Sequence, residues 1–150
     1  MKKIVITLFI LFVLGACVPN SGQSIDMPDE AVLAVTIGDI QETFALGDLQ
    51  VLPSEDVSFN GVLYKGVTMS TLLEVVSVNP DSLKALKAVA TDGYSVNYDP
   101  AQILKENVLV AYALADGSSL SADDGNYRMI LPDEGGKLNL RMLAELQILQ

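Results

Sequence analysis

The sequence predicts one α+β domain that is made mainly of β-strands. Half of its 150 residues are apolar, which is enough for a single buried core. Short alternating or continuous apolar runs recur from Ala31 onward, and Asn-Gly or Asp-Gly pairs separate several of them. Short segments with helical spacing and capping residues lie between these runs. Strands interspersed with a few short helices are typical of the α+β class.

Residues 1–17 are expected to be a bacterial lipoprotein signal peptide. Lys2 and Lys3 precede an apolar run at positions 4–14, which is shorter than the roughly 20 residues of a membrane-spanning helix. The run ends in LGAC, and two small residues before a cysteine resemble the lipoprotein processing site. Cys17 would then be the lipidated N-terminus. The alternative is an ordinary secretory signal with an incidental cysteine.

Residues 18–30 are rich in Pro, Ser, Gly and Asp and are expected to be a flexible tether to a domain at 31–150. We therefore expect a protein of the bacterial cell envelope, lipid-anchored and facing the periplasm or exterior. Removal of the signal leaves seven basic against 19 acidic residues, a net charge of −12. Such a surface repels phosphates, so nucleic acid is not an expected partner.

The first half of the domain is expected to form two hairpins. AVLAVTI and QETFAL flank Gly38-Asp39, and VSF and VLYKGV flank Asn60-Gly61. Asn-Gly favours a type I′ turn, because both central residues need a positive φ. LGDLQVLP between the hairpins is expected to be a short helical turn or a loop.

Three helix starts follow. TMSTLLEVV has leucines at helical spacing behind a cap at Thr68 or Ser70. Asn79-Pro80 and Asp99-Pro100 each place a capping residue before a proline at the first helical position.

ATDGYSVNYDP, residues 90–100, is expected to contain a third hairpin. KAVAT and YSVNY flank Asp92-Gly93, which suggests a type I′ turn. Alternation places Tyr94, Val96 and Tyr98 on one face of the second strand. The tyrosines would pack on the core, or the turn would form the rim of a binding pocket; the two interpretations are compatible.

The last third begins with NVLVAYALA, whose nearly continuous apolar run predicts a strand buried on both faces. YRMIL predicts a strand that ends at Pro132. From Leu138 to Ile148 every even position is apolar, which predicts a strand, with a helix over 143–149 as the alternative. The acid pairs Asp123-Asp124 and Asp133-Glu134 are interpreted as solvated loops.

The order of four segments resembles the molybdopterin-binding domain of the sulfite oxidase type. These segments are FALGDLQVLP, YKGVTMSTLL, ATDGYSVNYDP and NVLVAYALADGSSLSADDGNYRMILP. The resemblance covers about residues 31–150 and implies that family's mixed α+β fold. It also implies that Arg128 and Arg141 occupy positions where the family contacts its cofactor.

The departures from the family concern the metal. The family holds molybdenum through a cysteine thiolate just before the segment matched by YKGVTMSTLL, and carries a histidine before the strand matched by YRMIL. The chain has no histidine, and its one cysteine is Cys17; Asp124 lies nearest the histidine's place. Molybdenum prefers the soft sulfur ligand that is missing. We therefore expect no metal, and as cofactor at most a pterin without molybdenum.

Six residues are the candidate ligand contacts. In the functional interpretation the two arginines donate hydrogen bonds, Asp92 accepts from ring nitrogens, and the aromatic side chains stack on a flat ring. The structural alternatives are arginines paired with nearby acids and aromatic residues in the core. The candidates are Arg128, Arg141, Asp92, Tyr94, Phe59 and Tyr64.

The function expected from the sequence is a lipid-anchored extracytoplasmic module that binds a small pterin-like heterocycle. The alternative is an interaction domain with a vestigial pocket that docks another envelope protein. An enzyme is the least favoured class, since no histidine, domain cysteine or nucleophile motif is present. The membrane would be contacted through the lipid.

Overall fold

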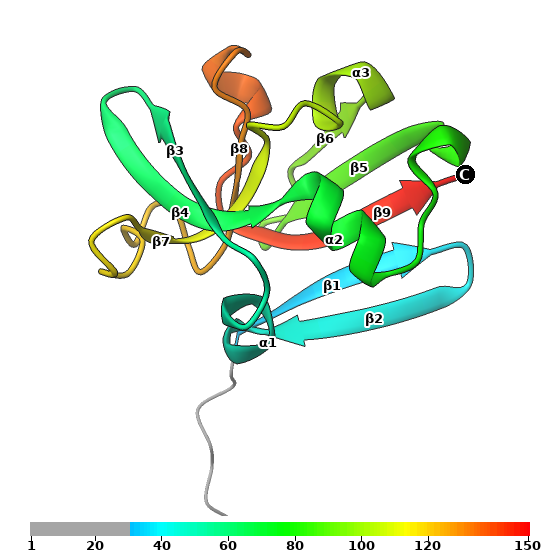
Figure 1. Cartoon of the computed structure of the whole chain (residues 1–150), viewed down its shortest axis with the longest axis horizontal. Coiled ribbons are helices and arrows are strands. Elements are labelled where there is room, and N and C mark those ends of the chain that lie inside the picture. The colour runs from blue at the N-terminus through cyan, green and yellow to red at the C-terminus, as the bar shows by residue number, and fades with distance from the viewer. Residues whose placement is uncertain (1–30) are drawn as a thin grey trace, which may run out of the picture.

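The structure is a computed structural model that describes residues 31–150 (Figure 1). The expected signal peptide 1–17, the lipidation site Cys17 and the tether 18–30 lie outside the described residues. Within 31–150, no helix has the length and apolar character needed to cross a membrane.

Two sheets make up most of the domain. The first has the strand order β2-β1-β9-β5-β6 and the second the order β3-β4-β7-β8. Neighbouring strands are antiparallel except β1 and β9, which are parallel. The first sheet contains β1 (Val32–Ile37), β2 (Ile40–Ala45), β5 (Ala85–Ala90), β6 (Ser95–Tyr98) and β9 (Leu143–Leu149). The second contains β3 (Glu55–Phe59), β4 (Val62–Thr68), β7 (Leu109–Leu114) and β8 (Arg128–Ile130).

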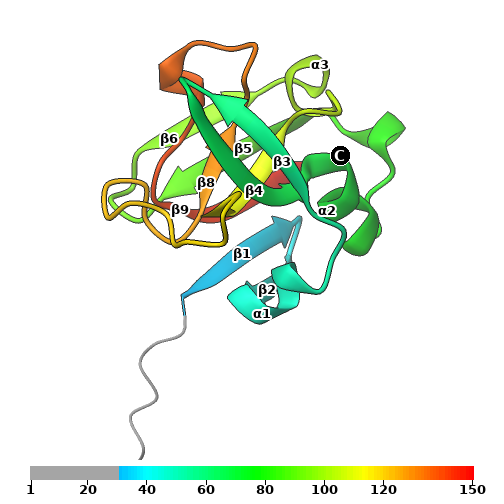
Figure 2. The same cartoon turned by 60° about the vertical axis from the view of Figure 1, so that its left-hand side comes forward.

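The helices are short and connect the strands (Figures 1 and 2). The α-helices are α1 (Leu46–Gln50), α2 (Met69–Val75) and α3 (Pro100–Ile103), and the 3₁₀ turns are η1 (Pro80–Ser82) and η2 (Gly136–Leu138). The mixed α+β architecture, mostly strands, is the one expected from the sequence.

The predicted local signals explain many of these elements. Asn60 and Gly61 have φ values of 49° and 79°, so the expected two-residue turn between β3 and β4 is confirmed. The Thr68 hydroxyl accepts from the Thr71 amide at 3.2 Å and caps α2. Asp99 and Gln102 form a reciprocal capping box at the start of α3. The segment after Asn79 is a single 3₁₀ turn rather than a longer helix.

β7 separates two apolar clusters, as its continuous apolar sequence predicted. Val110 and Tyr112 belong to the main core between the sheets, whereas Leu109 and Ala111 belong to a smaller cluster on the other face of the second sheet. We call this second group the small cluster; its buried members are Tyr64, Leu109, Ala111 and Ile130.

Gly66 allows β4 and β7 to approach closely beside the small cluster. A β-carbon at Gly66 would lie 2.2 Å from the Val110 carbonyl oxygen, at the point where the pairing register of the two strands shifts. A larger residue would push the strands apart. The bulge bends the second sheet, and the β3–β4 hairpin projects from the body of the domain (Figure 1).

The turn between β5 and β6 differs from the predicted type I′ turn. Only Gly93 has a positive φ, 85°, and its amide donates to the Ala90 carbonyl at 2.9 Å. Because of this turn, Tyr94 lies before the strand and is 54% exposed, whereas Tyr98 is buried in the main core. Of the two tyrosines only Tyr98 packs on the core, so that interpretation was wrong for Tyr94.

The C-terminal stretch is a strand, β9, and the alternative helix over 143–149 was wrong. The predicted alternation does not run through it unchanged. Met142 has a φ of 52°, and Ala144 has no partner where the pairing of β5 with β9 shifts register. The first feature reverses the phase and the second restores it, so that Leu140, Leu143 and Leu146 are buried while Met142 is 38% exposed.

Candidate functional site

A pocket of about 520 Å³ lies where turns from both sheets meet. Its walls come from four parts of the chain: the β3–β4 turn, the β5–β6 turn, the loop that leads into β8, and the segment from η2 to the start of β9. The lining residues are Phe59, Asn60, Ala90, Asp92, Tyr94, Asp123, Arg128, Gly136, Lys137, Asn139, Leu140, Arg141 and Met142.

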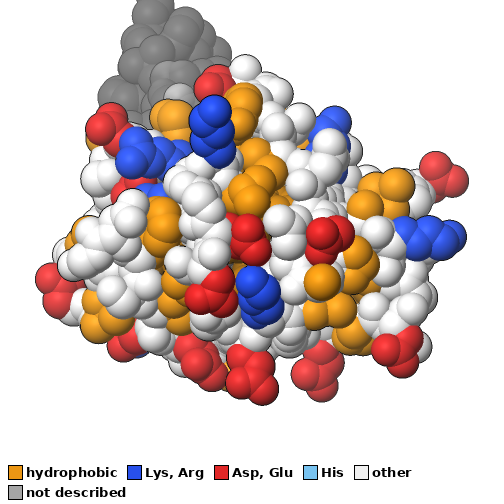
Figure 3. Space-filling view, turned by 90° about the horizontal axis from the view of Figure 1, so that it is seen from above, with side chains coloured by type: hydrophobic (Ala, Val, Ile, Leu, Met, Phe, Trp, Pro, Cys, Tyr) orange, Lys and Arg blue, Asp and Glu red, His pale blue; other side chains and the backbone are white. Residues whose placement is uncertain are grey.

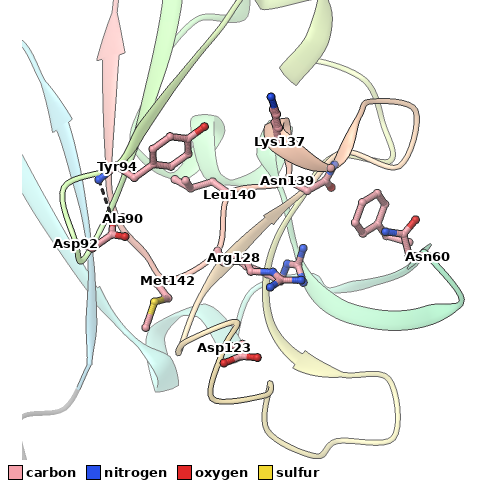
Figure 4. A pocket seen from close by; sticks show the side chains of 13 residues that line it. Asn60, Ala90, Asp92, Tyr94, Asp123, Arg128, Lys137, Asn139, Leu140 and Met142 are labelled. Atoms are coloured by element: carbon pink, nitrogen blue, oxygen red, sulfur yellow. Dashed lines mark hydrogen bonds between the residues drawn. The ribbon is translucent and has the colours of Figure 1, made fainter.

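Figure 4 shows how these side chains surround the space. Asp92 and Tyr94 lie on one side and Asn60 on the opposite side, with Arg128 between them. Asp123 lies below Arg128 in this view, and Lys137 lies above it. The segments that meet here are distant in sequence and are brought together by the two sheets.

Arg128 is the most deeply buried charge of the site. It is the first residue of β8 and its side chain is only 3% exposed. Its Nη1 donates to the Asp124 carboxylate at 2.6 Å and to the Tyr64 hydroxyl at 3.0 Å. Its guanidinium carbon lies 4.9 Å from the centre of the Tyr64 ring and 5.8 Å from that of Phe59, within the range of cation–π attraction.

The Arg128 side chain nevertheless has an unsatisfied donor. Its Nε is buried and has no hydrogen-bond partner among the described residues. A buried N–H without a partner costs about 1–3 kcal/mol. Because Arg128 lines the pocket, this N–H is a candidate donor to a bound molecule.

Asp124 also forms an ion pair with a second arginine, Arg141. The Arg141 Nε lies 3.4 Å from the same carboxylate oxygen that accepts from Arg128, and the Arg141 side chain is 61% exposed. Asp124 itself is 7% exposed, so the interpretation of Asp123-Asp124 as a solvated pair was wrong for Asp124. The reason is that Asp124 precedes the buried Arg128 by four residues and neutralises it.

Lys137, at η2, is a pocket residue that the sequence analysis missed. Positions 31–150 contain seven basic residues, and Lys137, Arg128 and Arg141 all line this pocket. The same positions carry 16 acidic residues, and acidic side chains lie around much of the face seen in Figure 3. The pocket therefore brings cations and acids together, since Asp92 and Asp123 also line it and Asp124 pairs with both arginines. Such a lining favours a ligand that carries both hydrogen-bond acceptors and donors.

Asp92 and Tyr94 form the rim on the β5–β6 turn. One Asp92 carboxylate oxygen accepts from the Tyr94 amide at 2.9 Å, which leaves the other oxygen available as an acceptor. The Tyr94 ring is more than half exposed beside the pocket. The geometry therefore allows the acceptor and stacking roles expected for these two residues.

The other two aromatic candidates have different positions. Phe59 is half-buried and lines the pocket. Tyr64 is buried in the small cluster and does not line this pocket; it contacts Arg128 from behind and faces a neighbouring cavity of about 320 Å³. Tyr64 can thus support the arginine but is not placed to stack on a ligand in the pocket.

Asn139 is a structural residue of the pocket floor. Its side chain accepts from the Leu131 amide and donates to the carbonyls of Leu131, Glu134 and Gly135. These bonds fix the turn after β8 and hold the neighbouring lining residues Lys137 and Leu140 in place.

The donor set does not fit molybdenum. No three His, Cys, Asp or Glu side chains within 31–150 are close enough to hold a metal ion. The one thiol of the sequence, Cys17, lies outside the described residues. We therefore derive no reaction step through a metal.

Comparisons with known proteins give a distant fold relationship. No protein-family model matches the chain, and no curated protein matches it. Among solved structures, the chain is similar to the sulfane dehydrogenase SoxCD from Paracoccus pantotrophus, with a TM-score of 0.64 and 19% identity. The match covers 78% of this chain but 37% of the other, so this chain spans well under half of that protein's length. The likeness shows a shared mixed α+β fold.

Proposed function

We propose that residues 31–150 are a sulfite oxidase-type domain that binds a flat, hydrogen-bonding heterocycle of pterin size, without molybdenum redox catalysis. The observation that carries the proposal is the unpartnered, buried Nε of Arg128 at a pocket that also collects Lys137 and Arg141. These donors, together with the Asp92 carboxylate on the same pocket, suit a ligand that carries both acceptors and donors.

The size and chemistry of the pocket support this ligand class. A volume of about 520 Å³ falls within the roughly 300–1,000 Å³ of small-molecule sites. Tyr94 and Phe59 contribute aromatic rings to the lining, Asp92 offers an acceptor, and the arginines offer donors. A pterin ring carries donors, acceptors and a flat face, so it matches these groups.

The direct test is calorimetric titration with pterin-6-carboxylate. Arg141→Ala should weaken binding about tenfold, the lower end for one charge-assisted hydrogen bond. Its effect on stability should stay within about 1 kcal/mol, since the side chain is largely exposed. Lys84→Ala removes the same charge from an exposed position away from the pocket, and should leave binding unchanged.

The outcome of the wild-type titration decides between the two candidate functions. The absence of both heat and a thermal shift with oxidised or reduced pterins at high micromolar concentration would contradict the proposal. It would favour the interaction domain with a vestigial pocket. Equal losses of affinity in both variants would show that the cations act only through the overall charge.

We also propose that the domain is held at the bacterial membrane by lipid on Cys17. The support is the sequence alone: two lysines, an apolar run and the small residues before Cys17. Cys17→Ser should release the protein from membranes or block its processing, as fractionation and intact mass would show. Unchanged fractionation of the variant, together with a wild-type mass lacking acyl groups, would overturn this part.

A further inference from the structure

We propose that Gly125 and Met142 form a backbone clamp that fixes Arg141 at the pocket, which makes Gly125 a positioning residue for ligand binding. The inference rests on the proposed function, because a ligand is what the clamped guanidinium would receive. Gly125 is not a lining residue of the pocket, so its effect would be indirect.

The segment Leu140–Leu143 is tied to its surroundings at three of its four residues. The Leu140 carbonyl accepts from the Met129 amide at 2.8 Å, and the Leu143 amide donates to the Tyr127 carbonyl at 2.8 Å. The remaining residue is Arg141, which lines the pocket. The backbone of this segment therefore determines where the Arg141 guanidinium can reach.

Met142 is hydrogen-bonded through both its amide and its carbonyl to other segments. Its amide donates to the Asp124 carbonyl at 2.7 Å, and its carbonyl accepts from the Thr91 amide at 2.9 Å. Its φ of 52° is unfavourable for a residue with a side chain. Such a conformation persists only where the surrounding structure imposes it, and here bonds to the β5–β6 turn and to the loop before β8 do so.

Gly125 provides the close contact that completes the clamp. Its φ is 75°, and a β-carbon there would lie 2.8 Å from the Met142 α-carbon and 3.3 Å from its β-carbon. The nearest atom is backbone, so it cannot yield by a side-chain rotation. A methyl group at Gly125 would push Met142, and with it Arg141, away from Asp124.

The residues next to Gly125 and Met142, Asp124 and Arg141, carry opposite charges and lie close together. Asp124 precedes Gly125 and Arg141 precedes Met142, and the Arg141 Nε lies 3.4 Å from the Asp124 carboxylate. The two dipeptides thus face each other through a hydrogen bond, an ion pair and a van der Waals contact. Moving one dipeptide separates the two arginines that share Asp124.

The experiment compares Gly125→Ala with Gly117→Ala. Gly117 also has a positive φ, 85°, but a β-carbon there would meet nothing within 4 Å. Both variants carry the conformational cost of alanine at positive φ, while only Gly125→Ala displaces Met142. Titration with pterin-6-carboxylate should show binding about tenfold weaker in Gly125→Ala, as if the Arg141 bond were lost, and unchanged in Gly117→Ala.

A second readout needs no ligand. In the free protein, the Arg141 Nε–H resonance should shift in Gly125→Ala and stay in place in Gly117→Ala. If the wild type binds no pterin, the proposed function fails while this resonance still tests the clamp. If the wild type binds and both variants bind equally, or the resonance does not move, the clamp is overturned and the proposed function stands.

Met142 offers a further pair in case Gly125→Ala does not fold. Met142→Gly and Met142→Ala both remove the thioether from the pocket wall, but only glycine frees φ at this position. The clamp predicts that Met142→Gly binds pterin-6-carboxylate more weakly than Met142→Ala. Equal affinities would contradict it.

Discussion

The main core and the small cluster differ in the side chains that border them. The main core consists of hydrophobic side chains, with tyrosine hydroxyls as its polar groups, and is shared by both sheets. The small cluster is covered on one side by a charged group, Arg128, whose guanidinium lies over the Tyr64 ring. One apolar face of β7 therefore contributes stability alone, while the other supports a buried cation at the pocket. The difference shows how a small domain can keep a charge inside without weakening its larger core.

The largest expected loss of stability comes from a substitution in the main core. Leu146 lies on β9 and is fully buried. Leu146→Ala should lower the free energy of unfolding by about 4 kcal/mol, through lost burial and the cavity that remains. Denaturant unfolding would measure the loss. In the small cluster Ala111→Gly removes far less volume, and a loss as large there would contradict the division between the two.

The next effect concerns the buried ion pair. Arg128→Met leaves the Asp124 carboxylate with only the exposed Arg141, and should lower the free energy of unfolding by about 3 kcal/mol. Adding Asp124→Asn removes the uncompensated charge, so the double variant should recover part of the loss. The 2.6 Å distance indicates that Arg128 and Asp124 are coupled. A double variant no more stable than Arg128→Met would contradict that coupling.

This result also changes what an Arg128 variant can reveal about binding. Both alternatives expected from the sequence apply to Arg128, since it pairs with an acid and lines the pocket. Its replacement would alter folding and affinity together. Arg141 is the cleaner probe of the ligand, because it is mostly exposed.

The smallest effect concerns Tyr98 in the main core. Its hydroxyl donates to the Leu138 carbonyl at 2.6 Å, and Tyr98→Phe should cost about 1 kcal/mol at neutral pH. Burial raises the pKa of the Tyr98 phenol well above its usual range. The unfolded chain therefore loses this proton first, and stability should fall as the pH rises above about 10. Tyr98→Phe should show a shallower alkaline decline; an identical decline would contradict this assignment.

Local signals explain why much of the fold could be predicted. Asn60-Gly61, Thr68 and Asp99-Pro100 act through their own backbone or that of residues a few positions away, so their effect is visible in the sequence. The continuous apolar run of β7 similarly reports burial on both faces.

The features that escaped prediction depend on distant partners. Met142 adopts a positive φ because Asp124 and Thr91 grip its backbone, and no residue near it in sequence signals this. Asp124 is buried because β8 carries Arg128 inward. Lys137 joins the pocket only once η2 folds toward the β5–β6 turn, although its place between two candidate arginines in sequence was a signal that could have been used.

The most direct test of the central claim is an NMR titration of the domain with pterin-6-carboxylate. We expect the amides of Asp92–Tyr94 and Gly136–Met142 to shift, together with the Arg128 Nε–H, which has no hydrogen-bond partner within residues 31–150. Signals of the main core, such as those of Leu86 and Leu146, should stay in place. Shifts that avoid the pocket, or an Arg128 Nε–H that does not respond at saturation, would contradict the claim that this site binds the ligand.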